Sequence, residues 1–187
     1  MARLLDEEEE LWEELENVEK APDEGQIVDA FIKIDGIDGE SQDDKHKNEI
    51  EVIGWVGHLE NVGSSHAGGG AGTGRSIHHG FKFAKLQDKS SPKLLQACAS
   101  GEHIKKAEFV VRKAGKQQQE YLKYTFSDVF VSGFRHLEKP DPTSHQFRDG
   151  FELSYGKFEM EYKEQKADGT LGGAVKAGYD VKARKKV

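Results

Sequence analysis

Eight histidines could in principle bind metal ions or transfer protons in this 187-residue chain. They are scattered along the sequence, and one adjacent pair, His78–His79, would point to opposite faces of a strand. The residues from Asp35 to Glu40 resemble a calcium loop only loosely, because Ile37 stands where an oxygen ligand is needed. No cysteine or carboxylate pair has the spacing of a metal motif. We therefore expect no metal site, and no pair of carboxylates is marked as a catalytic dyad.

Two further patterns could do chemistry, and neither predicts an enzyme. The glycine-rich stretch from Gly69 to Ser76 approximates a phosphate-binding loop, but it has Arg75 where lysine is required and precedes an alternating strand pattern rather than a helix. Cys98 is the single cysteine, so the chain forms no internal disulfide, which is typical of a reducing cytoplasm. No histidine–acid pair stands near Cys98 to activate it as a nucleophile, so we expect a core residue. We expect no catalytic residue and no cofactor.

Charge divides the chain into an acidic leader, residues 1–26, and a nearly neutral body, residues 27–187. The leader holds eleven acidic and two basic residues, a net of −9, whereas the body has a net of +2. A nearly neutral body favours self-association over nucleic-acid binding. No apolar run approaches the length of about 20 residues that a membrane span needs, and the N-terminus lacks the features of a signal peptide.

The leader has the pattern of an amphipathic helix over residues 3–20. Leu4, Leu11, Trp12 and Leu15 lie near one face, and glutamates occupy most of the rest. Two interpretations remain open: a solvated extension, or a helix that docks its apolar stripe on the body or on a neighbour. A stripe that contains Trp12 and several leucines would be costly to leave in water, which favours docking.

The body has the alternation typical of β-strands. Residues 29–34 and 49–56 predict two strands joined by a long polar connection that begins at Asp35–Gly36. The remaining pattern predicts a glycine-rich loop over 57–76, strands over 77–86, 104–112, 121–134 and 151–162, a glycine-rich connection over 165–178 and a last strand over 179–185. A helix is expected over 90–101, with Leu94, Leu95 and Cys98 on its buried side.

Two strands change the phase of their apolar residues, near Asp128 and at Gly156, which predicts bulges that bend both strands. The predicted fold is therefore mainly β: a small closed barrel or tight antiparallel sandwich, with one short packed helix and long glycine-rich loops. An exposed loop is expected over 136–146, where Pro140 and Pro142 occur.

Long segments of the body resemble the haemolysin-coregulated protein (Hcp) family of bacterial type VI secretion. The segments are FIKIDGIDGESQDDKHKNEIEV, HAGGGAGTGR, SSPKLLQACASGEHIKKAEFVVRKAG, EYLKYTFSDVFVS and EYKEQKADGTLGGAVKAGYDVKARKKV. The resemblance implies a hexameric ring that stacks head to tail into a tube and holds small effectors. It also implies sheath and spike components as partners, and export from the bacterial cytoplasm without a signal peptide. Family members usually begin close to the first strand, so the acidic leader is a departure.

The same resemblance suggests residues for assembly and cargo. It implies that the glycine-rich loop reaches adjoining subunits, and we expect basic residues of the last strand to meet acidic residues of the next ring. The expected ring and stacking residues are Gly68, Gly69, Gly70, Gly72, Arg75, Asp43, Asp44, Lys182, Arg184 and Lys185. Trp55 and Val56 are expected at the lumen, where the family commonly has polar residues flanking the tryptophan.

A second hypothesis is a monomeric β-barrel that binds a carbohydrate or another ligand. It would use the glycine-rich loops and aromatic residues such as Trp55 and Tyr179 as a cleft. The mass of the protein in solution separates this hypothesis from a ring.

Overall fold

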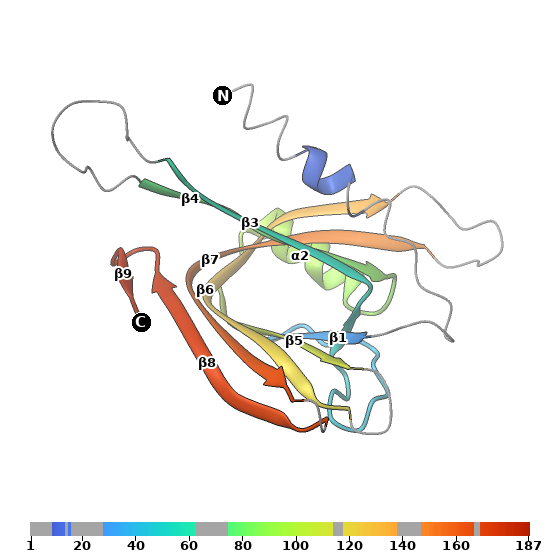
Figure 1. Ribbon diagram of the computed structural model, residues 1–187. Helices are drawn as coiled ribbons and strands as arrows, with labels where there is room; N and C mark the ends of the chain where they lie inside the picture. Colours follow the sequence, from blue (N-terminus) through green and yellow to red (C-terminus); the bar gives the residue numbers. More distant parts are fainter. Residues whose placement is uncertain are drawn as a thin grey trace, which may run out of the picture.

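The computed structural model describes residues 9–13, 15, 28–62, 75–113, 118–137, 147–166 and 169–187. Within them the chain is mainly antiparallel β-sheet with one short packed helix, which confirms the predicted fold class (Figure 1). A further helical segment covers residues 9–13 and 15. The elements in order are β1 (Val28–Ile34), β2 (Ile50–Val52), β3 (Gly54–Val62), β4 (Arg75–Leu86), α2 (Ser91–Ser100), β5 (Ile104–Lys113), β6 (Glu120–Leu137), β7 (Arg148–Gln165), β8 (Leu171–Asp180) and β9 (Lys185–Lys186).

The sheet has the order β2-β1-β5-β6-β7-β4-β3, with β8 added beside β7 and β9 beside β8. Its two end strands, β2 and β3, are successive parts of the chain that are separated only by Ile53. The backbone N–H of Ile53 donates to the carbonyl of Ala84 in β4 at 2.9 Å. The chain thus passes from pairing with β1 to pairing with β4 within one residue, and the sheet curls around its core (Figure 1).

Alternating side chains fill the inside of the curl. On β1, Ala30, Ile32 and Ile34 are buried, as the alternation predicts. Their register partners on β5 are the predicted inner face, namely Val111, Phe109 and Ala107. The ring of Phe83 lies 5.1 Å from those of Phe109 and Phe151, so aromatic packing joins strands that are far apart in sequence.

Phe31, on the other face of β1, is also buried. Its ring stacks on His46 with centroids 4.3 Å apart, and the Arg112 guanidinium lies 4.8 Å from its centroid. Arg112 donates hydrogen bonds to Asp29 at 3.0 Å and to Asp43 at 2.5 Å. This group fastens the polar connection between β1 and β2 to the outside of the sheet.

The predicted phase changes in β6 and β7 occur at facing positions. The register runs from Ser127↔Lys157 to Val129↔Tyr155 without a shift, which sets Asp128 opposite Gly156. Asp128 has φ 54°, and a Cβ on Gly156 would lie 2.9 Å from the Asp128 Cβ. The bulges predicted near Asp128 and at Gly156 are therefore wrong: a left-handed residue turns the strand there, and the register shift lies between Val131 and Gly133.

Helix α2 begins after Ser90 and ends at Gly101, whose φ of 64° suits glycine. The Ser90 hydroxyl donates to Asp88 and makes no cap bond to the helix. Leu94 and Ala97 form the buried side, whereas Leu95 is 49% exposed. The prediction that Leu95 is buried was wrong, because Leu95 lines an open hollow between α2 and β6.

Two segments predicted as loops are strands. β3 continues to Val62, so the pairing with β4 includes residues 57–62 of the predicted loop. β8 occupies the predicted connection over 165–178, and the predicted last strand is instead the end of β8, a turn and β9. Small residues suit β8, because a Cβ on Gly178 would lie 2.8 Å from the Phe158 carbonyl oxygen.

Candidate functional site

Strand β8 presents an open edge. One of its edges pairs with β7, from Lys157↔Asp180 to Gln165↔Leu171. Within the described part of the chain, its other edge pairs only at Tyr179 and Asp180, with β9. Its central side chains are exposed, including Val175 at 69%. An open edge of this length is a template for pairing with another chain.

Strand β3 presents a second open edge, because its ladder partner among the described residues is β4 alone. It leads to the glycine-rich loop, and Leu59 on it is 52% exposed. The expected contact residues of the loop, Gly68, Gly69, Gly70 and Gly72, lie outside the described residues. Arg75 is the first residue of β4.

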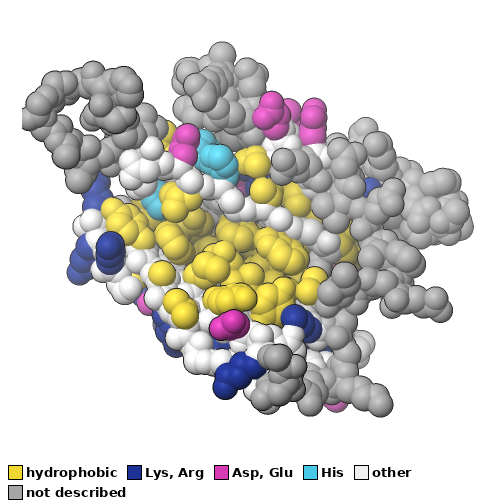
Figure 2. Space-filling model, viewed as in Figure 1, with side chains coloured by type: hydrophobic (Ala, Val, Ile, Leu, Met, Phe, Trp, Pro, Cys, Tyr) yellow, Lys and Arg dark blue, Asp and Glu magenta, His cyan; other side chains and the backbone are white. Residues whose placement is uncertain are grey.

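Between the β3–β4 hairpin and strands β6–β8, apolar side chains gather on the face that Figure 2 shows. Several aromatic residues of the core remain only partly buried: Trp55, Tyr121, Tyr124, Tyr155 and Phe158. Burial raises the pKa of Tyr155 to about 12, with a smaller contribution from Tyr124. Open edges and a partly exposed apolar face together indicate a surface suited to self-association.

The charged residues expected at the stacking contact differ in their availability. Asp43 is bound to Arg112, and Lys182 pairs with Asp128 at 2.8 Å. Among the described residues, Asp44, Arg184 and Lys185 form no ion pair within the chain. These three therefore remain available for the stacking contact that the resemblance predicts.

Asp43 also links stability to pH. The hydrogen bond from Arg112 lowers the pKa of Asp43 to about 2, and backbone N–H groups of Lys45 and His46 assist. A depressed carboxyl pKa adds stability above the unfolded pKa, and this stability is lost as the pH falls from about 4 to about 2. Asp43→Asn should therefore lower the free energy of unfolding by about 2 kcal/mol at pH 7 and flatten its decline over that pH range. Urea titrations at several pH values test this, and an equally steep acid limb in the variant contradicts it.

The two residues expected at the lumen, Trp55 and Val56, lie in different clusters. Trp55 packs on the main core, with its ring 5.1 Å from that of Phe109. Val56 packs with Trp12 and Leu15 in a second cluster. The alternation of β2, if continued, would place Trp55 on the face opposite to buried Ile50 and Val52. The chain bends at Ile53, between β2 and β3, so Trp55 packs against the core instead.

The second cluster holds the N-terminal helical segment against the sheet. Trp12 is 4% and Leu15 is 1% exposed, and they pack with Ala84 and Leu137. Glu9 accepts two hydrogen bonds of 2.9 Å from the Arg135 guanidinium. Leu11 is half-buried, and Leu4 lies outside the described residues.

Glycines make room for the indole ring. A Cβ on Gly150 of β7 would lie 2.6 Å from Trp12 Cζ3, and one on Gly133 of β6 would lie 3.4 Å from Trp12 Cζ2. The Arg135 guanidinium lies 4.8 Å and Lys82 Nζ lies 5.5 Å from the ring centroid. The segment thus occupies a slot that small residues and two cations form.

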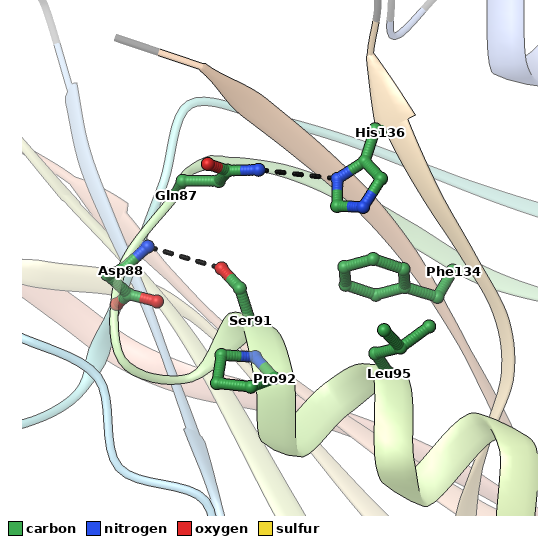
Figure 3. A pocket seen from close by; sticks show the side chains of 7 residues that line it. All are labelled: Gln87, Asp88, Ser91, Pro92, Leu95, Phe134 and His136. Atoms are coloured by element: carbon green, nitrogen blue, oxygen red, sulfur yellow. Dashed lines mark hydrogen bonds between the residues drawn. The ribbon is translucent and has the colours of Figure 1, made fainter.

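An open hollow of about 320 Å³ lies where α2 meets β6 (Figure 3). Leu95, Pro92 and Phe134 form its apolar side. Its polar groups bond to one another: Gln87 Nε2 lies 3.3 Å from His136 Nδ1, and the Asp88 N–H donates to Ser91 Oγ at 3.2 Å. This arrangement gives the hollow little capacity to bind a polar ligand.

Beneath that hollow lies a buried ion pair. Lys85 and Asp149 are both fully buried, with Lys85 Nζ 3.6 Å from Asp149 Oδ2. Lys85 also donates to Ser91 Oγ at 2.9 Å and contacts Asp88 at 2.8 Å. The ion pair therefore joins β4, β7 and the start of α2.

The similarity of this chain to known proteins covers the same β-rich body. Residues 31–162 match the family described as "Type VI secretion system effector, Hcp". The chain belongs to the Hcp family. It is 38% identical over 157 residues to Protein hcp1 of Pseudomonas aeruginosa, covering 83% of this chain and 96% of that protein. The matched residues run from β1 into β7, so the N-terminal helical segment, β8 and β9 lie outside the family match.

Solved Hcp structures share the fold. Hcp1 from Salmonella typhimurium is similar with a TM-score of 0.69 and 41% identity, covering 86% of this chain and 99% of that chain. A type VI secretion system effector from Yersinia pestis gives a TM-score of 0.65 and 36% identity, covering 82% and 100%. A type six secretion system protein gives 0.79 and 28%, covering 86% and 99%. Among the described residues of this Hcp chain, no helix is long and apolar enough to cross a membrane.

Proposed function

We propose that this Hcp chain is a structural subunit of the type VI secretion tube. Six copies form a ring, the rings stack head to tail, and the lumen carries small effectors. The sheath and spike components of the machine are its other partners, and export requires no signal peptide. The observation that carries this proposal is the family match over residues 31–162, supported by a relative that is matched over 96% of its length.

The two open edges give the proposal a physical basis. β3 and β8 offer unpaired backbone groups on different parts of the molecule, so a contact between them joins unlike surfaces. Contacts between unlike surfaces form a ring when the rotation between copies closes. The partly exposed aromatic face adds apolar area that a neighbouring copy could cover. The work of such a subunit is mechanical and protective rather than catalytic.

The first test is the mass of the purified protein. Six copies of the 20.9 kDa chain give about 125 kDa, which mass photometry and light scattering measure directly. We expect this species at micromolar concentrations, and rings in negative-stain images. A monomer or dimer throughout that range contradicts the proposal and supports the monomeric ligand-binding barrel.

Val175 provides a matched pair of variants for the edge of β8. Val175→Lys places a charge at the centre of the open edge, and lysine is a common protection of edge strands against pairing. Val175→Thr keeps the shape and the strand preference at the same position. The lysine variant should shift the mass toward the monomer while the threonine variant keeps the ring. Equal ring populations in both variants exclude the β8 edge as the contact.

A further inference from the structure

The β3–β4 hairpin brings together two histidines and a glutamate that are not neighbours in sequence. His58 and Glu60 lie on β3, and His79 lies on β4. One ligand atom from each lies within 4.8 Å of the others. His79 Nε2 is 3.1 Å from Glu60 Oε1, and the imidazole rings of His58 and His79 meet edge to face with centroids 4.7 Å apart.

A bulge on β4 produces this arrangement. Gly57 pairs with Phe81 and Leu59 pairs with His78, so His58 alone faces the two residues His79 and Gly80. A β-bulge changes the direction in which side chains point, and the backbone at Gly80 permits the extra residue of this bulge. Gly80 has φ 78°, a conformation that suits glycine.

The pair His78–His79 is divided between the two sides of the sheet. The His78 ring lies against Tyr155 and Tyr179 at centroid distances of 6.1 Å. His79 is buried toward Glu60 instead. The two histidines thus do not chelate together, but His79 meets ligands that the neighbouring strand supplies.

We propose that His58, Glu60 and His79 bind a divalent transition-metal ion, with zinc as the preferred ion. Two imidazole nitrogens and one carboxylate oxygen are a ligand set that zinc accepts, and a water molecule would complete a tetrahedron. Ligand atoms about 2.0–2.1 Å from zinc lie roughly 3.3 Å apart in a tetrahedron. The 3.1 Å separation between Glu60 and His79 already meets this condition.

The required adjustment is small. His58 is half-buried and the Glu60 side chain is 35% exposed, so both can rotate, whereas buried His79 provides a fixed ligand. Lys82 does not compete for the site, because its ammonium pairs with Glu152 at 3.3 Å and reaches the His79 carbonyl at 3.5 Å. Figure 2 shows histidine side chains beside an acidic side chain on the open face near this hairpin, where an ion can enter from solvent.

The bound ion would cross-link the two strands near the middle of the hairpin's ladder. A ligand that binds the folded state alone raises its stability with concentration. Among the described strands β3 pairs with β4 alone, so the ion adds a metal-dependent cross-link to the ladder that holds β3 in the sheet.

The test uses the full chain without an affinity tag and zinc chloride as the probe. Dialysis followed by elemental analysis should find one zinc ion per chain, zinc should raise the melting temperature, and cobalt should give the visible absorption of a low-coordinate site. His58→Gln and Glu60→Gln each remove one ligand at a half-exposed position and should weaken zinc binding by at least about tenfold. Because both residues are half-exposed, the folded state should survive, which circular dichroism checks.

His103→Gln is the control, because His103 is an exposed histidine that follows α2 in the sequence and contacts Asp128. It should bind zinc as the unaltered chain does. The proposal is overturned if the unaltered chain binds no zinc at about 100 μM, a concentration well above the usual dissociation constants of protein zinc sites. Equal binding by the control and by both ligand variants also overturns it, since the ion would then lie elsewhere.

Discussion

Replacing Gly150 by alanine is expected to release the N-terminal helical segment from the sheet while the body stays folded. The added Cβ would lie 2.6 Å from Trp12 Cζ3 and 3.2 Å from Leu137 Cδ2, closer than packed carbon atoms approach. Gly150 is paired on both sides, with Ala84 of β4 and Arg135 of β6, so its backbone has little room to move, whereas the segment can lift away. The variant therefore loses the burial of Trp12 and Leu15, worth about 1.5–3 kcal/mol each.

Proteolysis measures this release. A loss of about 3 kcal/mol of local stability raises the population of the open segment about 100-fold. A glutamate-specific protease should then cut near Glu9 and Glu13 at least that much faster in the variant. Hydrogen exchange over residues 9–15 should rise in parallel, while exchange in β5 and β6 stays slow.

Gly173→Ala is the matched control. It makes the same change on β8, and a Cβ there meets nothing within 4 Å. In this variant the protease should cut the N-terminal helical segment as slowly as in the unaltered chain. Changing Trp12 and Leu15 together to serine should reproduce the release without any clash on the sheet. If Gly150→Ala leaves the cutting rate unchanged, the slot does not hold the segment in solution.

Replacing Lys85 by methionine should lower the free energy of unfolding by about 3–5 kcal/mol. The change leaves the fully buried Asp149 carboxylate without its lysine partner, and an unpaired buried charge is strongly destabilising. It also removes the contacts of Lys85 with Asp88 and Ser91 at the start of α2. Gln87 and His136 still contact Asp149, so the carboxylate retains part of its solvation.

A second substitution separates the lost charge from lost packing. Adding Asp149→Asn to Lys85→Met removes the unpaired charge and should recover a substantial part of the stability. Lys89→Met changes a lysine on the exposed turn before α2 and should stay within about 0.5 kcal/mol of the unaltered chain. Urea unfolding at one protein concentration compares all four proteins. A loss below about 1 kcal/mol in Lys85→Met means that the pair does not anchor α2.

The sequence predicted those elements whose own side chains determine their structure. β1 and β5 alternate clearly because one face of each lies in the core, and α2 has a proline near its start and a glycine at its end. Even the change of phase at Asp128 and Gly156 was visible, because apolar residues move from even to odd positions at Asp128 and from odd to even positions at Gly156. The form of that change was not, since a left-handed residue and a bulge give the same alternation.

β8 could not be recognised from its own residues. Its glycines and alanines lack the alternation of a strand, and it is ordered by the edge of β7 that it pairs with. The slot for Trp12 was hidden for a similar reason. The apolar stripe that contains Trp12 indicates that another surface must cover it. The fit of the indole ring, however, depends on Gly133 and Gly150, which lie far along the chain.

The cluster of His58, Glu60 and His79 was missed because its spacing is not local. The pattern His58-Leu59-Glu60 places two ligands on one strand, and this much could be read from the sequence. The third ligand requires the register of a hairpin with a bulge, and residues 63–74 separate the two strands in the sequence. Register of this kind depends on the completed sheet.

The single residue between β2 and β3 has a consequence for how the chain folds. Because Ile53 alone separates β2 from β3, one stretch of the chain forms both ends of the sheet. Elements that follow one another in the chain pair in the ladders β1–β2, β3–β4, β5–β6, β6–β7 and β7–β8. Only two pairings within the described sheet bring distant residues together: β1 with β5, as in Ile32↔Phe109, and β4 with β7, as in Phe83↔Phe151. Closing large loops costs chain entropy before contacts repay it, so these two ladders should set the folding rate while the hairpins form early.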